Sequence, residues 1–227
     1  MSDMASLWGT LVPLVIGSAI VPVQILVTVM LLRSSLRTAA AWVAGMAAVR
    51  VAQGIVFGVV LADALAHSPA SSGPGLGGST LLLVFAVLFY VTALSKALTE
   101  DDPDAPPPRW MEKAGSMSWP AAFGIGAGYV AISPKFWVFT LGALAAIAEA
   151  PLGGRSAALT YVEFVVLALS TNLAILGFAA VAPARSASAL ERFSGWLQSN
   201  DRIITVVLGV VFGTWFMYKA LGGFGIL

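Results

Sequence analysis

The two stretches that decide the fold each have a proline at the centre of an apolar run. Residues 17–24 read GSAIVPVQ, and residues 128–136 read GYVAISPKF. When Pro22 is aligned with Pro134, the apolar segments in the two halves of the chain correspond one to one. Proline inside a helix removes one backbone hydrogen bond and clashes with the preceding turn, so we expect each proline to kink or break its helix. Backbone groups freed at such breaks can face a ligand.

The composition is typical of a membrane protein. Of the 227 residues, 59% are hydrophobic and only 10% are charged, and the mean hydropathy is +0.91. A hydrocarbon core of about 30 Å takes about 20 helical residues per crossing, so this length allows roughly six spans and no sizeable extramembrane domain. Six charge-poor apolar runs predict membrane helices, at about 7–32, 39–62, 80–98, 119–148, 157–182 and 203–221.

The order of these runs predicts an all-α polytopic membrane protein with six transmembrane helices in two inverted repeats. We expect a single membrane domain over residues 1–227, with three-helix repeats at 1–99 and 119–227. An acidic, proline-rich cytoplasmic linker at 100–118 is expected to be extended and hydrated. Because each repeat has an odd number of helices, the second enters the bilayer from the opposite face, and inverted repeats are typical of secondary transporters.

The distribution of Lys and Arg between the loops predicts the orientation in the membrane. Eight of these residues fall in the loops on one side, and two, Arg155 and Lys219, fall on the other side. By the positive-inside rule, the three basic loops face the cytoplasm and both termini face outward. The eight residues are Arg33, Arg37, Lys96, Arg109, Lys113, Arg185, Arg192 and Arg202.

The third basic loop contains a segment in which apolar and charged residues mix at helix-like spacing. Leu190, Phe193 and Trp196 are interspersed with Glu191 and Arg192. This pattern predicts an interfacial amphipathic helix over residues 185–198, with a plain loop as the alternative.

Five side chains that carry a charge or an amide fall inside the predicted spans. They are Arg50, Gln53, Lys135, Glu163 and Asn172. A charge at the centre of a membrane helix costs roughly 2.5 to 3.5 kcal/mol on insertion scales, so we expect the three charged side chains to find partners or water. The alternative is snorkelling toward an interface, which is a stronger competitor for Glu163, near the outer end of its span, than for Arg50.

Two of these charges occupy nearly equivalent places in the two repeats. Arg50 follows Pro22 by 28 residues, and Glu163 follows Pro134 by 29, so we predict an ion pair between them across the pseudo-two-fold axis. Lys135 is then left to bind an anionic group of a substrate, and Glu163 is the acid best placed to carry a proton. The candidate substrate-binding residues are Pro22, Gln24, Arg50, Gln53, Ser133, Pro134, Lys135 and Asn172, and the candidate proton-carrying or charge-balancing residue is Glu163.

Several kinds of chemistry are not expected from this sequence. The 12 basic and 11 acidic residues nearly cancel, which argues against a nucleic-acid partner. There is no cysteine, so disulfides, thiolate metal sites and sulfur redox chemistry are excluded. The one histidine, His67, lies in a Ser/Gly/Pro stretch and is expected to be a solvated loop residue. Because no metal-ligand cluster, nucleotide-binding motif or catalytic motif is present, we expect no metal, no cofactor and no enzyme activity.

Short motifs in the chain resemble those of a known superfamily of exporters. Residues 133–139, SPKFWVF, resemble the Asn-Pro-Lys-x-x-x-Phe signature of the LysE superfamily, with Ser133 in place of Asn. The Val-Pro-Val at 21–23 and the basic turn at 33–37 are most similar to its GAP or sulfolipid-addressing (SfLAP) branch. The amino-acid exporters have Pro-Gly-Pro where this chain has Val-Pro-Val, and the thiol-relay relatives need paired cysteines, which this chain lacks.

The resemblance implies a role in delivering lipid to the cell envelope. The leading expectation is a secondary transporter or translocator that exports an amphipathic glycolipid across the bacterial inner membrane. One alternative is a proton-coupled exporter of amino acids or other small polar metabolites, and another is a non-transporting scaffold of a lipid-synthesis or export complex. Membrane lipids are the expected partners, and small-residue helix faces are compatible with a homodimer.

Overall fold

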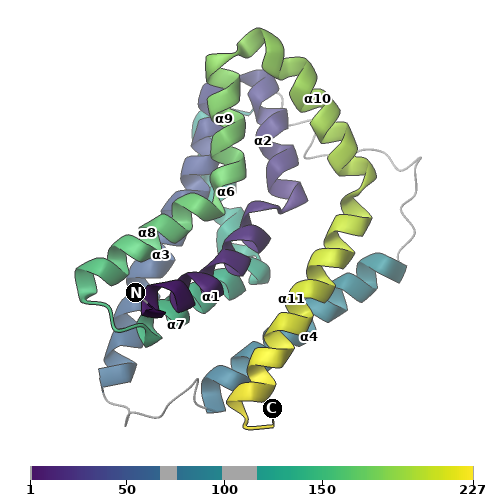
Figure 1. The fold of residues 1–227 in the computed structure, drawn as a ribbon. Coiled ribbons are helices and arrows are strands. Elements are labelled where there is room, and N and C mark those ends of the chain that lie inside the picture. Colours follow the sequence, from purple (N-terminus) through teal and green to yellow (C-terminus); the bar gives the residue numbers. More distant parts are fainter. Residues whose placement is uncertain (1, 67–75, 99–116, 227) are drawn as a thin grey trace. The chain divides into compact units, whose positions relative to one another are not determined.

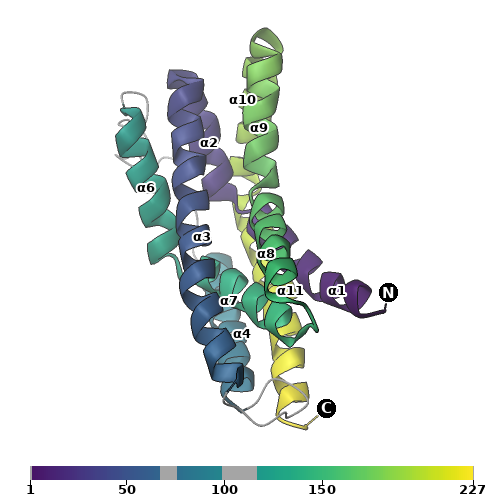
Figure 2. The ribbon, with the colours of Figure 1, turned by 90° about the vertical axis from the view of Figure 1, so that its left-hand side faces the viewer.

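The structure, a computed structural model, describes residues 2–66, 76–98 and 117–226. Every regular element in these residues is an α-helix (Figures 1 and 2), which confirms the all-α class. The predictions for His67, Arg109 and Lys113, and for most of the 100–118 linker, lie outside the described residues. The helices are α1 (Ser2–Ala19), α2 (Pro22–Ser34), α3 (Leu36–Ala66), α4 (Leu76–Leu98), α6 (Trp119–Ile132), α7 (Pro134–Glu149), α8 (Gly154–Ala168), α9 (Ser170–Val181), α10 (Pro183–Ser199) and α11 (Asp201–Gly223).

The chain divides into two compact units. The first comprises Met1–Ala64 and Pro106–Leu197, and the second comprises Leu65–Ala105 and Gln198–Leu227. The first unit therefore contains α1, α2, nearly all of α3, and α6 to α10, whereas α4 and α11 form the second.

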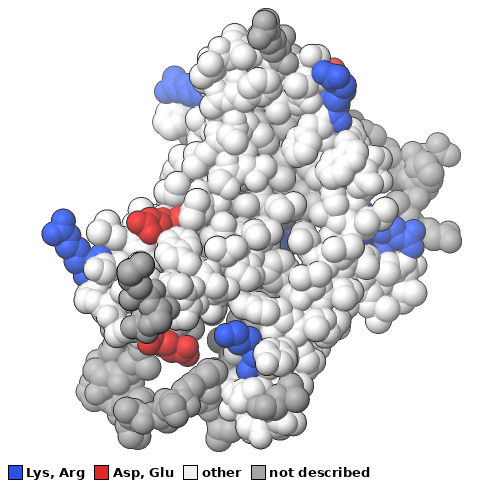
Figure 3. All heavy atoms as spheres, in the orientation of Figure 1, with Lys and Arg blue, Asp and Glu red and all other residues white. Residues whose placement is uncertain are grey.

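The described helices have the length and apolar character of membrane spans. Two stretches, Leu36–Val59 and Asp201–Gly223, are each long and apolar enough to cross a membrane. Three bent pairs of helices pass the same test when each pair is taken as one span, which gives up to five spans. Large apolar side chains such as Ile55 and Val207 are exposed, and the face shown in Figure 3 is mostly uncharged. These features fit a multi-pass membrane protein, whereas the sixth span and the inverted repeat remain predictions.

Both predicted proline breaks are present. Helix α2 begins at Pro22 and is bent by 50° from α1, and α7 begins at Pro134 and is bent by 71° from α6. The residues before the prolines have nearly identical backbone angles: φ −77° and ψ 113° at Val21, and φ −78° and ψ 113° at Ser133. Proline disfavours the helical region for the preceding residue but fits the first position of a new helix. The two stretches therefore break at the same backbone conformation before the proline, although the two bends differ in size.

A third break divides the segment predicted as one helix at 157–182. Helices α8 and α9 meet at Leu169 with an angle of 61°. Leu169 has φ −101° and ψ 4°, and its N–H is shared between two carbonyl oxygens of the preceding turn, at 3.1 and 3.2 Å. No proline is present, but the residues at 170–172 are Ser-Thr-Asn, which form helices weakly because their side chains compete for backbone groups. The prediction of one continuous helix is wrong.

The segment predicted at 185–198 is helical and lies within α10. Ser194 and Leu197 are buried, whereas Glu191 and Arg192 are exposed. The helix is therefore amphipathic, and the alternative of a plain loop is wrong. Its position at the membrane surface remains a prediction.

Within the first unit, α3 and α6 approach each other closely at two glycines. A Cβ atom added to Gly45 would lie 2.1 Å from the backbone oxygen of Phe123, and one added to Gly126 would lie 2.2 Å from that of Trp42. No side chain fits at either position without moving a backbone, so small residues set the distance between these helices.

The second unit is an antiparallel pair of helices, α4 and α11. At the end of α4, Lys96 Nζ lies 3.1 Å from Asp201 Oδ2 at the start of α11. Farther along, the ring of Phe89 packs against those of Phe212 and Phe216, with centroids 5.8 and 5.7 Å away. These aromatic contacts bury one face of each helix.

Candidate functional site

A polar cluster in the first unit is centred on Arg50, in α3. Arg50 is fully buried, and among the Lys, Arg, Asp and Glu residues whose side chains the structure describes it is the buried one. Its Nη2 donates a hydrogen bond of 2.6 Å to Ser18 Oγ, in the last turn of α1. Its guanidinium carbon lies 4.9 Å from the ring centroid of Phe136, in the first turn of α7, which is within cation–π range. The charge is therefore held beside both proline breaks.

The positive charge of Arg50 has no counter-ion among the side chains that the structure describes. Its Nε and Nη1 are buried and have no hydrogen-bond partner. The predicted ion pair with Glu163 is wrong, because Glu163 is exposed on α8 and Ser18 is the described hydrogen-bond partner of the guanidinium. Burying a charge without a partner is costly. The cluster is therefore electrostatically complementary to an anion.

The backbone around Arg50 is fixed by a tyrosine from α8. The hydroxyl of Tyr161 donates a hydrogen bond of 2.7 Å to the carbonyl oxygen of Arg50. The ring reaches α3 because residue 54 is glycine: a Cβ atom added to Gly54 would lie 2.0 Å from Tyr161 Cε1. This close approach positions the part of α3 that carries the arginine.

Amide and hydroxyl side chains extend the cluster beyond the arginine. Gln24 Nε2 donates 2.7 Å to the carbonyl oxygen of Ser18, and Thr140 Oγ1 donates 3.3 Å to Gln53 Oε1. Thr28 Oγ1 lies 2.8 Å from both the Gln24 carbonyl oxygen and Asn172 Oδ1, and since a hydroxyl has one proton it donates to one of them at a time.

Each of these amides keeps one polar atom free of hydrogen bonds. The buried atoms without a partner include Gln24 Oε1, Gln53 Nε2 and Asn172 Nδ2, and the Tyr129 hydroxyl is also buried without one. Buried polar groups are normally hydrogen-bonded. The cluster therefore offers both donors and acceptors to a polar ligand.

The structure brings together only some of the predicted site residues. Gln24, Arg50, Gln53 and Asn172 are all buried in the cluster, and Pro22 is buried at the start of α2. Ser133 and Lys135 are half-buried and Pro134 is exposed. Lys135 Nζ lies 5.5 Å from the ring centroid of Phe136, the ring that also contacts Arg50. Glu163 is exposed and lies apart from the cluster's hydrogen bonds.

Six residues of the cluster were not predicted from the sequence: Ser18, Thr28, Tyr129, Phe136, Thr140 and Tyr161. Two signals could have identified some of them. Ser18, Tyr129 and Phe136 lie inside the proline-centred stretches at 17–24 and 128–136. Thr28 follows Gln24 by four residues, which places both on one face of a helix.

Taken together, the fold and the site define a multi-pass helical membrane protein whose broken helices surround a buried, positively charged polar cluster. Such an arrangement is typical of membrane proteins that bind a polar ligand within the bilayer. A family profile described as Sap, sulfolipid-1-addressing protein, matches residues 11–222. The chain belongs to this family. No curated protein and no solved structure matches the chain.

Proposed function

We propose that the protein is a secondary transporter or translocator that exports an anionic amphipathic lipid of the cell envelope across the bacterial inner membrane. The observation that carries the proposal is the buried guanidinium of Arg50, whose Nε and Nη1 have no hydrogen-bond partner in the described part of the chain. The family is named for a sulfolipid, and a sulfolipid has an anionic headgroup. Guanidinium groups bind sulfate and phosphate oxygens through short, charge-assisted hydrogen bonds.

In this proposal, the substrate is the counter-ion of Arg50. Because no buried carboxylate balances the charge among the side chains that the structure describes, binding of an anionic headgroup would remove the cost of the unpaired charge. The free amide atoms of Gln24, Gln53 and Asn172 would bind polar groups next to the anion, and Lys135 would add a second cation. Glu163, exposed on α8, has no part in this anion site.

The helix breaks supply the movement that transport needs. Arg50 has no exposed surface, so a substrate reaches it only if the half-helices around it move apart. The breaks at Val21, Ser133 and Leu169 interrupt the helical hydrogen bonding next to the cluster. In the proposed six-span arrangement of two inverted repeats, these breaks let each repeat open toward one side of the membrane in turn.

A second candidate is an exporter of a small anionic metabolite. It is favoured by the enclosure of the cluster, because Gln24, Arg50 and Asn172 each have no exposed surface, which suits a compact anion as well as a headgroup. Under this candidate the same guanidinium would bind a carboxylate, and no lipid would accumulate when the protein is absent.

The test compares a deletion strain complemented with wild type, Arg50→Gln or Arg50→Lys. Surface-extractable lipids and excreted metabolites are quantified in the same cultures, with the amount of protein in the membrane fraction measured for each variant. Hydrogen bonds to a charged group contribute about 1.5–3 kcal/mol, so Arg50→Gln should lower export at least about tenfold. Arg50→Lys should restore part of it, since a lysine keeps the charge but not the planar set of donors.

The matched control is Arg192→Gln, which removes an exposed arginine from α10 and should leave export unchanged. Normal export by a stably expressed Arg50→Gln would overturn the proposed site. An unchanged lipid profile together with altered metabolite excretion would favour the small-metabolite candidate.

A further inference from the structure

A groove separate from the Arg50 cluster lies among α2, α9 and α10 of the first unit. Its volume is about 360 Å³. The apolar part of its wall includes Val29 and Leu32 from α2, Ala179 from α9 and Leu190 from α10. The charged side chains that line it are Arg33 and Glu191. An apolar groove whose charged side chains lie together can bind a molecule that has an apolar chain and a charged end.

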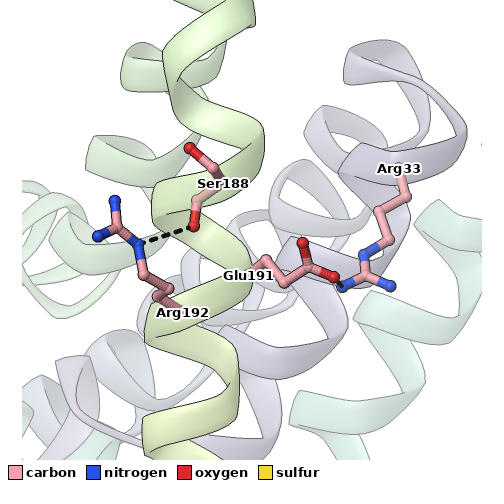
Figure 4. Close-up of polar contacts among 4 residues, drawn as sticks. All are labelled: Arg33, Ser188, Glu191 and Arg192. Carbon is pink, nitrogen blue, oxygen red and sulfur yellow. Dashed lines mark hydrogen bonds and ion pairs between the residues drawn. The ribbon is translucent and has the colours of Figure 1, made fainter.

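The two charges form an exposed ion pair. Arg33 Nη2 lies 3.4 Å from Glu191 Oε1, and the two side chains are 63% and 72% exposed. Figure 4 shows them pointing toward each other from α2 and α10, while Arg192 extends from the other side of α10 and donates to the Ser188 carbonyl oxygen. Because an exposed pair stabilises little, Arg33 can exchange Glu191 for another anion at little cost.

We infer that this groove binds an acyl chain of an anionic membrane lipid, with Arg33 binding the headgroup in place of Glu191. The apolar wall matches the chain, and the arginine matches the negative charge of the headgroup. The amphipathic character of α10, one wall of the groove, suits a helix that lies at the headgroup level. The occupant is therefore a lipid of the adjacent leaflet.

The groove shares two helices with the Arg50 cluster. On α2, Val29 lines the groove, while the preceding residue, Thr28, contacts Asn172 of α9 at 2.8 Å. On α9, Asn172 belongs to the cluster and Ala179, about two turns later, lines the groove. The Thr28–Asn172 contact thus joins α2 and α9 between the two sites. A role of the groove as the route by which a lipid reaches Arg50 rests on the proposed function. Lipid binding in the groove does not depend on that function.

The test is photo-cross-linking of the purified full chain in phosphatidylcholine vesicles that contain phosphatidylglycerol with a diazirine in its acyl chain. Cross-linked peptides are mapped by mass spectrometry. In the wild type, cross-links should concentrate on the peptides of α2 and α10 that line the groove. Replacing phosphatidylglycerol with a zwitterionic diazirine lipid should lower this yield about fivefold, the effect of one cation on an anionic lipid.

Two variants of the ion pair should have opposite effects. Arg33→Gln removes the cation and should lower the yield with phosphatidylglycerol about fivefold. Glu191→Gln frees Arg33 from its partner and should raise the yield. A pair that only held the two helices together would give the same result when either partner is lost. Arg192→Gln is the matched control for charge and should leave the yield unchanged.

Ala179→Trp fills the groove and should abolish the groove cross-links of both lipids while leaving cross-links elsewhere. Equal effects of Arg33→Gln and Glu191→Gln, or cross-links spread evenly over all helices, would overturn the inference. Arg50→Gln separates the two proposals, since it should keep the groove cross-links and lose export. Groove cross-links in a protein that exports no lipid would overturn the proposed function alone.

Discussion

The side chains of Arg50 and Ser18 are joined by a hydrogen bond of 2.6 Å from Nη2 to Oγ. It ties α3 to the last turn of α1, immediately before the first proline break. The guanidinium next to the break is therefore held by a neutral hydroxyl group. Its Nε and Nη1 remain without a hydrogen-bond partner among the described residues.

Ser18→Ala should destabilise the protein by about 1–3 kcal/mol, because a third nitrogen of the buried guanidinium loses its partner. The measurement is the thermal unfolding of purified protein in detergent. Ser188→Ala, which removes an exposed hydroxyl, is the control and should shift the midpoint little. A Ser18→Ala protein as stable as the control would mean that the hydroxyl contributes nothing to holding Arg50.

Arg50→Met should increase stability while abolishing export. Replacing a buried charge that lacks a counter-ion by an apolar side chain of similar volume removes the desolvation cost, and such changes stabilise proteins by about 1–4 kcal/mol. Thermal unfolding without added anions tests this in the same detergent. Loss of stability would indicate that the guanidinium is already compensated, which contradicts an open anion site.

Added sulfate gives the complementary measurement. An anion that binds the native state raises the unfolding midpoint as its concentration passes the dissociation constant. We expect sulfate at constant ionic strength to raise the midpoint of the wild type and not that of Arg50→Met. An equal rise in both proteins would assign the effect to the solvent rather than to the site.

Gly54→Ala should destabilise the protein by about 1–3 kcal/mol, because the new methyl group overlaps the ring of Tyr161. Gly58→Ala, one turn later in α3, meets no atom within 4 Å and should be neutral or stabilising by up to about 1 kcal/mol. The measurement is the thermal unfolding midpoint of each variant, compared with that of the wild type. Similar losses in both would show that the cost comes from the helix itself and not from the contact with Tyr161.

The proline breaks and the three amides that the structure shows buried could be predicted from the sequence, because both follow from local rules. A proline restricts the backbone conformation of the preceding residue in any structural context. A polar amide side chain within a membrane-spanning segment usually faces the interior of the helix bundle. Gln24, Gln53 and Asn172 accordingly lie in the cluster. The Thr28–Asn172 contact joins residues 144 positions apart, and no local pattern contains such a pairing.

The residue of α8 that contacts Arg50 lies two positions before the predicted Glu163, and it binds the backbone of Arg50 rather than its guanidinium. Each residue turns a helix by about 100°, so a side chain two positions away points to a nearly opposite face. The residue that reaches Arg50 is Tyr161, through its hydroxyl, and Glu163 is exposed. Spacing alone could not fix the rotation of α8. The break at Leu169 was also not predicted, and α3 is one uninterrupted helix from Leu36 to Ala66.

The orientation of the chain gives a last prediction, and the absence of cysteine makes it directly measurable. Ser156 in α8 and Ser188 in α10 are both exposed, and the excess of Lys and Arg places the first outside and the second in the cytoplasm. In intact cells a membrane-impermeant maleimide should label Ser156→Cys and not Ser188→Cys, while both react after the membrane is opened. The reverse pattern would invert the predicted orientation of the chain, and labelling of both in intact cells would mean that the segment between them does not cross the membrane.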